Sequence, residues 1–190
     1  MAPHVPPVRQ RAAIAWSGPL IPECHRAPRL RSRPGLRFVP IGRDFHGRDL
    51  VLLTVLKGAT IFLADLSRAI PIHHRHEFMA ISAYRGASTA SSGRIRLLKD
   101  IDRPIRDQDV LIVEDVVDTG LTLNYLYKTL RFRGAASVEV CTLLDRPYRR
   151  LTDVTPRYVG FTSSDEFVVG YGFDYRQRYR NLPDIHLLNR

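Results

Sequence analysis

Five short, largely apolar segments separated by stretches of helical periodicity constrain the fold of this chain more than any other feature. We predict strands at 50–56, 76–84, 110–114, 137–144 and 157–161. Between them, residues 59–70 and 121–133 place apolar side chains on one helical face, and Pro71 and Gly134 mark the helix ends. Apolar strands that alternate with helices predict an α/β fold, with a mostly parallel, twisted sheet flanked by helices. Ligands of such sheets bind at the carboxyl ends of the strands.

The apolar run Val110–Val113 is followed directly by two acids, Glu114 and Asp115, and then by a third, Asp118. One interpretation is structural, because acids are common at exposed strand ends and Asp118 or Thr119 can cap the next helix. Three carboxylates within five residues repel one another, however, so a solvated turn would gain little from the cluster. The cluster is better explained by a ligand that is polyhydroxylated or cationic.

The residues that follow, Thr119, Gly120, Leu121 and Thr122, have the composition of a phosphate-binding loop. Gly120 allows the loop to curl, so that backbone N–H groups and two hydroxyls can surround a phosphate. The next helix adds unpaired N–H groups and the positive end of its dipole. Acids that bind ribose hydroxyls, followed by a loop that binds phosphate, predict a ribose-5-phosphate site.

The segment VLIVEDVVDTGLT (110–122) resembles the signature of type I phosphoribosyltransferases, which bind phosphoribosyl pyrophosphate (PRPP). Further segments resemble the hypoxanthine-guanine members of that family: LKGA (56–59), DEFVVGY (165–171), Asp174-Tyr175 and RYRNLP (178–183). The resemblance extends over residues 42–188 and implies the type I fold with a flexible lid loop. It also implies purine salvage: PRPP and hypoxanthine or guanine give IMP or GMP and pyrophosphate, with Mg²⁺ as cofactor. A homodimer or homotetramer is expected.

The resemblance assigns the central motif to PRPP and to proton transfer. Glu114 and Asp115 are expected to bind the 2′- and 3′-hydroxyls of ribose, and the segment Thr119–Thr122 is expected to bind the 5′-phosphate. Asp118 is expected to lie near N7 of the purine and to act as general base. These roles make the motif the centre of the predicted site.

The remaining site residues are also assigned by resemblance. Lys57 and Gly58 should contact pyrophosphate with help from Arg180, and the peptide bond before Lys57 is often cis in this family. Asp174, together with the two ribose-binding acids, should hold Mg²⁺ directly or through water. Each residue also has a simpler interpretation, such as a solvated strand end for Lys57, but their joint occurrence in the family's order argues against it.

The base should be held by Phe167, which stacks on the purine, and by the backbone of Val168. Arg146 stands where the family has a lysine that contacts the 6-oxo group; it keeps the charge but is longer and planar. This departure concerns base preference more than activity.

A segment rich in small residues, from Ser82 to Arg96, fits the mobile lid that excludes water from the reaction. The family usually has a Ser-Tyr pair there, whereas this chain has Ala83-Tyr84. Tyr84 is the lid residue that we expect to act at the site.

The net charge of +10 invites a nucleic-acid interpretation, but it is concentrated near the start of the chain. Residues 1–37 hold seven arginines against one acid, and seven of the 13 prolines. We therefore predict a poorly ordered arm at 1–36 and a phosphoribosyltransferase domain at 37–190. No apolar run is long enough to span a membrane, and no signal peptide is visible, so cytoplasmic location is expected.

Two alternatives to catalysis remain open at this stage. The first is a phosphoribosyltransferase-like, nucleotide-sensing regulator that binds RNA, which the charge favours and the purine segment disfavours. The second is a catalytically silent assembly partner, suggested by Ala83 and the unusual N-terminus. The histidines at 73, 74 and 76 have no standard metal-site spacing, and we expect them to lie at an exposed strand edge.

Overall fold

The computed structural model describes residues 24–26, 39–83, 95–163 and 165–188. The main strands are β2 (Leu50–Val55), β3 (His74–Ala83), β4 (Ile95–Lys99), β5 (Asp109–Val117), β6 (Ser137–Asp145) and β7 (Tyr158–Thr162). They form a six-stranded sheet in the order β4-β3-β2-β5-β6-β7. Neighbouring strands pair in parallel except at the β3–β4 edge, which is antiparallel. The predicted mostly parallel α/β sheet is confirmed.

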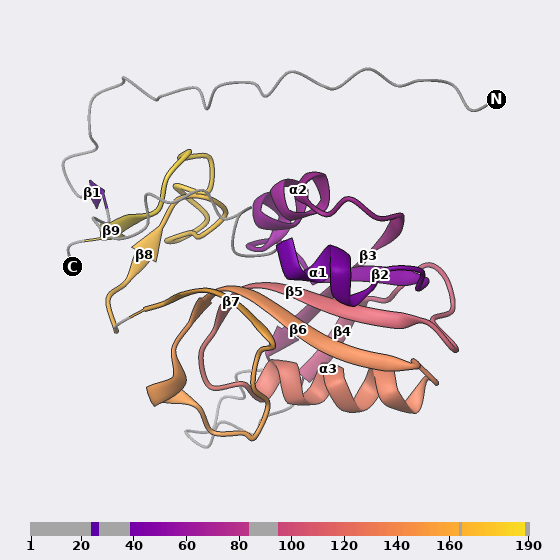
Figure 1. The fold of residues 1–190 in the computed structure, drawn as a ribbon. Helices are drawn as coiled ribbons and strands as arrows, with labels where there is room; N and C mark the ends of the chain where they lie inside the picture. The colour runs from indigo at the N-terminus through magenta and orange to yellow at the C-terminus, as the bar shows by residue number, and fades with distance from the viewer. Residues whose placement is uncertain (1–23, 27–38, 84–94, 164, 189–190) are drawn as a thin grey trace.

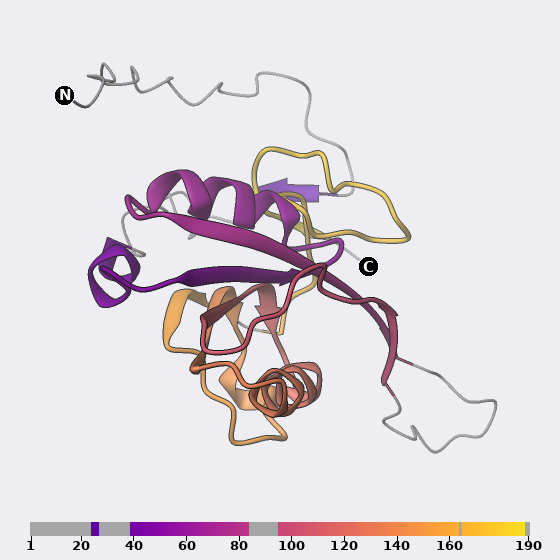
Figure 2. The ribbon, with the colours of Figure 1, turned by 90° about the vertical axis from the view of Figure 1, so that its right-hand side faces the viewer.

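Helices cover both faces of this sheet (Figure 1). The helices α1 (Val39–Asp44) and α2 (Thr60–Ala69) lie on one face, and α3 (Leu121–Phe132) lies on the other. Figure 2 shows α3 almost end-on, with the sheet between it and α2. The predicted helices at 59–70 and 121–133 are thus confirmed as α2 and α3. No helix in the described ranges is long and apolar enough to cross a membrane.

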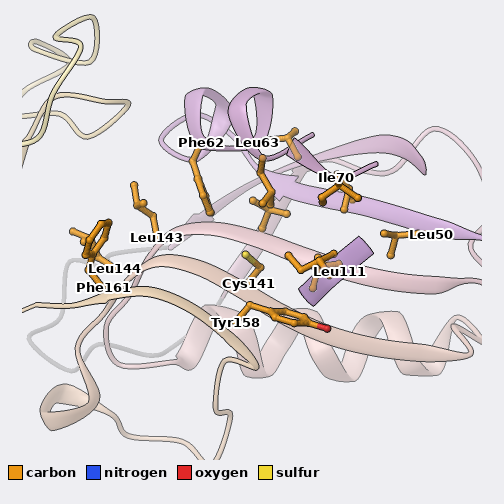
Figure 3. Close-up of a cluster of buried hydrophobic side chains, with 14 of the residues drawn as sticks. Leu50, Phe62, Leu63, Ile70, Leu111, Cys141, Leu143, Leu144, Tyr158 and Phe161 are labelled. Carbon is orange, nitrogen blue, oxygen red and sulfur yellow. The ribbon is translucent and has the colours of Figure 1, made fainter. Parts of the chain in front are cut away.

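The alternation of side chains along the strands divides the core into two layers. In β2, Leu50 and Leu52 pack with Phe62 of α2, whereas Val51 and Leu53 belong to the layer under α3. Figure 3 shows the first layer between α2 and the sheet. Both faces of β2 are buried, which explains why its sequence is continuously apolar rather than alternating.

A second, three-stranded sheet lies beside α2 (Figures 1 and 2). It contains β1 (Cys24–Arg26), β8 (Val168–Val169) and β9 (His186–Leu188), with β9 in the middle and both pairings antiparallel. We call residues 165–188 the hood. Strand β1 lies inside the predicted arm of residues 1–36, so these three residues are part of a sheet; the rest of the arm lies outside the described residues.

Two predicted boundaries near the motifs need correction. Strand β5 does not end at Glu114 but continues to Val117, because β6 pairs with it as far as Asp145. The predicted lid at 82–96 is also too long at both ends, because Ser82 pairs with Arg96 in the β3–β4 ladder. Residues 84–94, including Tyr84, lie outside the described residues. The 3₁₀ helix η2 (Pro147–Arg149) follows β6.

Candidate active site

A cleft of about 370 Å³ opens at the carboxyl ends of β2 and β5, beside the start of α3. Its lining includes most of the polar residues predicted for the site: Lys57, Gly58, Glu114, Asp115, Asp118, Thr119, Gly120, Thr122, Asp174 and Arg180. Apolar residues that sequence reasoning did not select complete the lining: Val55, Leu56, Ile81, Val116, Val117 and Leu123. The fold therefore brings together segments that are more than 120 residues apart in the chain, from Lys57 to Arg180.

The acids of β5 carry negative charge into a poorly hydrated wall of this cleft. Removal from water raises the pKa of Glu114 well above its ordinary value, and the neighbouring charge of Asp115 raises it further. Removal from water also raises the pKa of Asp115 to about 6, against the opposing effects of the Val116 N–H group and of Arg180. Such shifts are typical of functional sites, where a ligand supplies the missing donors or positive charge.

The loop after β2 packs directly against these acids. A Cβ atom on Gly58 would lie 1.8 Å from Oδ2 of Asp115, so the loop can approach the carboxylate this closely only because residue 58 is glycine. The N–H of Leu56 donates to the carbonyl of Met79 at 2.8 Å and ties the loop to β3. The Leu56–Lys57 peptide bond is cis, as the family resemblance predicts. Lys57 thus lines the cleft from a loop that packs directly against the β5 acids.

The predicted phosphate loop connects β5 to α3. Gly120 has φ +80°, a left-handed conformation that favours glycine, and its carbonyl accepts the N–H of Asn124 at 2.9 Å in the first turn of the helix. The first N–H groups of α3 have no partner within the helix and lie at its positive end. The side chain of Leu121 is half-exposed and lies outside the cleft lining, so its predicted contribution to the PRPP site is that of its backbone N–H group at the start of α3.

The hood contributes an ion pair to the cleft lining. Nη2 of Arg180 lies 2.6 Å from Oδ1 of Asp174, and Nη1 donates to the carbonyl of Gly172 at 2.7 Å. Oδ2 of Asp174 accepts the N–H of Gln177 at 2.8 Å. The hydroxyl of Tyr171 donates to Asp65 of α2 at 2.5 Å and anchors the hood to the main domain. These contacts hold Arg180 over the β5 acids.

The three predicted purine-binding residues are not part of the cleft lining. Arg146 is buried; its backbone N–H donates to the carbonyl of Val117 at 3.0 Å, and its Nη2 donates to the carbonyl of Glu166 at 2.6 Å. Phe167 meets the ring of Tyr175 edge-on at 5.7 Å, and Val168 is buried in β8. Arg146 therefore joins the end of β5 to the start of the hood, adjacent to the cleft rather than in its wall.

The acid set suits magnesium only with help from a ligand. Carboxylate oxygens are the donors that Mg²⁺ prefers, and it is usually held by one or two carboxylates, waters and substrate phosphates. Within the described ranges no group of three or more His, Cys, Asp or Glu side chains converges on one point. The arrangement of Glu114, Asp115 and Asp174 therefore fits an ion that arrives with an oxygen-rich substrate.

Sequence reasoning missed two arginines next to Asp118. Nε of Arg149 lies 3.1 Å from Oδ1 of Asp118, and Nε of Arg150 donates to the backbone carbonyl of Asp118 at 3.1 Å. Arg149 ends η2 and Arg150 follows it, well away from the central motif in the sequence. The charge of this pair, just after the strand that neighbours β5, is the signal that could have identified it.

Histidines 73, 74 and 76 lie away from this cleft, in or beside β3. His74 and His76 each place Nε2 at 2.9 Å from the hydroxyl of Ser67, and Nδ1 of His74 lies 2.7 Å from the carbonyl of Ile72. Removal from water and the neighbouring His74 lower the pKa of His76. The two imidazoles are therefore part of a hydrogen-bonded network between α2 and β3.

Comparison with known proteins places this chain in a family. Residues 41–176 match the sequence profile of the phosphoribosyl transferase domain. The chain is 57% identical to a hypoxanthine-guanine phosphoribosyltransferase of Mycobacterium avium over 143 residues, which cover 75% of this chain and 70% of the relative. It is 53% identical to the enzyme of the same name from Mycobacterium tuberculosis over 155 residues, which cover 78% and 76% of the two chains.

The fold agrees with solved structures of the same kind. A hypoxanthine phosphoribosyltransferase from Staphylococcus aureus superposes with a TM-score of 0.77 at 40% identity, and the match covers 84% of this chain and 92% of that one.

Proposed function

Because the chain belongs to the phosphoribosyl transferase domain family, we propose that it is a purine-salvage enzyme that transfers the 5-phosphoribosyl group of PRPP to hypoxanthine or guanine. The products are IMP or GMP and pyrophosphate. The observation that carries this proposal is the convergence of the β5 acids, the phosphate loop and Lys57–Gly58 on one cleft. The identity to relatives of that name supports the choice of base.

In this reaction the bond between C1′ of ribose and a pyrophosphate oxygen breaks, a bond to a purine nitrogen forms, and the base loses a proton. Glu114 and Asp115 accept hydrogen bonds from the ribose hydroxyls. Residues Thr119–Thr122 bind the 5′-phosphate through hydroxyls and N–H groups at the start of α3. Asp118, between these two sets, takes the proton from the base.

Lys57, Gly58 and Arg180 bind the pyrophosphate end of PRPP. When bound, Mg²⁺ neutralises charge on the pyrophosphate as it leaves, and Asp174, Glu114 and Asp115 would hold it together with substrate oxygens. In the structure Arg180 forms an ion pair with Asp174, so the two side chains balance each other's charge in the cleft lining. Tyr84 is proposed to cover the site from the lid, which keeps water from C1′.

The base is held by Phe167, Val168 and Arg146. Arg146 offers only donors, so it suits the 6-oxo group of hypoxanthine and guanine and opposes the 6-amino group of adenine. One of its terminal nitrogens already donates to Glu166, which leaves the other for the base. We further propose a cytoplasmic homodimer or homotetramer. Asp118 and the purine segment favour catalysis over a nucleotide-sensing regulator that binds RNA, because together they supply the general base and the purine pocket that the transfer requires.

The decisive experiment is an assay of the purified protein with PRPP and Mg²⁺ and, in turn, hypoxanthine, guanine, xanthine and adenine. We expect transfer to the first two, loss of transfer on chelation of Mg²⁺, and loss in a Glu114→Gln, Asp115→Asn double variant. Absence of transfer to every base, in a protein that still binds PRPP, would contradict the proposal.

A further inference from the structure

Residues 146–152 run from the end of β6 through η2 and three residues beyond it. This segment contacts the phosphate loop from outside the cleft. We call it the supporting segment. The N–H of Leu151 donates to the carbonyl of Thr119 at 2.8 Å, and Oγ1 of Thr152 would lie 2.3 Å from a Cβ atom placed on Gly120. Asp118 and the first two residues of the phosphate loop thus all contact the supporting segment.

Within this segment, Arg149 links the two halves of the proposed site. Its Nε lies 3.1 Å from Oδ1 of Asp118, and its Nη1 donates to Oδ1 of Asp165 at 3.1 Å. Asp118 directly follows β5, and Asp165 begins the hood, which contains Phe167 and Val168. One guanidinium therefore bridges the carboxylate proposed as the base and the segment proposed to hold the purine.

The Asp118 oxygen that faces Arg149 depends on this contact. Oδ1 of Asp118 is buried and accepts no hydrogen bond from the described residues, so the guanidinium is the positive group that compensates it. The Asp118 side chain as a whole is 35% exposed, so loss of the cation should disturb the placement of the carboxylate more than the stability of the fold. The ion pair thus restrains one oxygen of Asp118 and leaves the other to accept a proton.

We propose that Arg149 is a positioning residue that orients Asp118 relative to the bound purine. This inference rests on the proposed function, because it assigns Asp118 and the hood to opposite sides of the base. It predicts a specific division of effects: ligands that fill the purine half should depend on Arg149, and ligands that fill only the ribose-phosphate half should not.

Arg157 provides a matched control. It also bridges two acids, with Nη2 at 3.0 Å from Oδ2 of Asp44 and Nη1 at 3.4 Å from Oε1 of Glu139, and its side chain is 45% exposed against 44% for Arg149. It directly precedes β7 and bridges α1 and β6, away from the cleft lining. Loss of either arginine should have a similar small effect on unfolding, because half-exposed ion pairs contribute little.

The test compares affinities for IMP and for ribose 5-phosphate by calorimetry in the wild-type protein and in the variants Arg149→Met, Arg149→Lys, Asp165→Asn and Arg157→Met. We expect Arg149→Met to weaken IMP binding at least about tenfold, as loss of one charged partner does, with ribose 5-phosphate binding unchanged. Arg149→Lys should recover part of the loss, since the charge remains, and Asp165→Asn should weaken IMP by a smaller factor. Arg157→Met should match the wild type for both ligands, and unfolding in urea should show all variants folded.

Equal affinities in Arg149→Met and Arg157→Met would overturn the proposal, and so would an equal loss of both ligands, which would mark Arg149 as general support for the loop. If Arg149→Met does not fold, an unchanged ratio of the two affinities in Arg149→Lys and Asp165→Asn would overturn it. A wild-type protein that binds IMP but transfers no phosphoribosyl group contradicts the proposed activity alone, because the affinity ratio still decides the role of Arg149.

Discussion

Asp100 and Asp115 each accept a hydrogen bond from the N–H of the next residue, at 2.8 and 2.7 Å, yet folding shifts their pKa values in opposite directions. Asp100, on the surface beside α3, meets both terminal nitrogens of Arg133, at 2.6 and 2.8 Å. These bonds lower its pKa. Asp115 lies in the cleft wall, where loss of water outweighs the influence of Arg180 and raises the pKa to about 6.

The difference shows at which acids a ligand, rather than the protein, must supply positive charge and hydrogen-bond donors. At Asp100 the fold supplies its own cation, so the charge is satisfied before anything binds. At Asp115 and Glu114 it does not, and the two acids stay short of positive charge and of donors. Hydroxyls of ribose and an accompanying cation would meet both needs, which agrees with the proposed function.

The largest effect should come from removing a cleft carboxylate with a direct chemical role. We expect Asp118→Asn to lower kcat by about 10²- to 10⁴-fold, the usual cost of losing a general base, while PRPP still binds. The same substitution at Asp100 is the control and should leave kcat unchanged. Steady-state kinetics and PRPP titration measure both; normal turnover by Asp118→Asn would remove this residue from the proposed role.

Substitution of Asp115 should show most clearly that one change can weaken function and increase stability. Its pKa is higher in the folded protein than its ordinary 3.8, so the folded state holds more protons between pH 3.8 and about 6, and the Asp115 contribution to the unfolding free energy falls as pH rises through that window. Asp115→Asn removes the titrating carboxyl group and with it this loss of unfolding free energy. We expect the variant to be more stable than wild type by about 1 to 2 kcal/mol at pH 7.5, and to bind PRPP poorly.

Urea unfolding at pH 5 and pH 7.5 checks this expectation, with Asp100→Asn as the comparison. The pKa of Asp100 is lowered by folding, so its contribution has the opposite sign: it is present above the ordinary pKa and is lost as pH falls. Asp100→Asn should therefore lose up to about 1 kcal/mol at pH 7.5, the range of a partly exposed ion pair. A loss of stability in both variants would mean that the cleft acids are compensated after all.

A smaller effect is expected at Arg146, the arginine that stands in place of the family's lysine. A donor that faces the amino group of adenine should disfavour that base at least about tenfold relative to hypoxanthine. Arg146→Lys should keep this preference, because charge and donor type survive, and Arg146→Met should lose it. Ratios of kcat/KM for the two bases decide the matter; a preference that survives in Arg146→Met would assign recognition to the Val168 backbone instead.

The smallest effect should follow from shortening the N-terminus. Deleting residues 1–23 should change neither catalysis nor stability, and deleting 1–36 should leave catalysis largely intact. The longer deletion also removes β1 and opens the edge of β9, so we expect it to lower the unfolding free energy by about 1 kcal/mol, in the range of single lost edge contacts. An inactive or unfolded product of the longer deletion would make the predicted division at residue 36 wrong.

Local pattern was sufficient for the secondary structure that builds the site. Continuous apolar runs at 50–56 and 110–114, and helical stripes at 59–70 and 121–133, identify β2, β5, α2 and α3, because burial on both faces of a strand and on one face of a helix imposes distinct periodicities. The order of acids, glycine and threonines after Val113 located the cleft for the same reason: those residues are adjacent in the chain, so their proximity needs no tertiary information. Their chemical roles remain predictions.

Long-range contacts were not accessible in this way. The approach of Gly58 to Asp115, the placement of Arg180 near Asp115, and the bridge from Arg149 to Asp118 and Asp165 join segments separated by loops and whole strands. Neither composition nor periodicity encodes such distances. The same limit explains why β5 was predicted too short and why β1 was assigned to the arm: both depend on backbone pairing with a distant strand. The raised pKa of Asp115 belongs to this class as well, since hydration and the position of Arg180 exist only once the chain has folded.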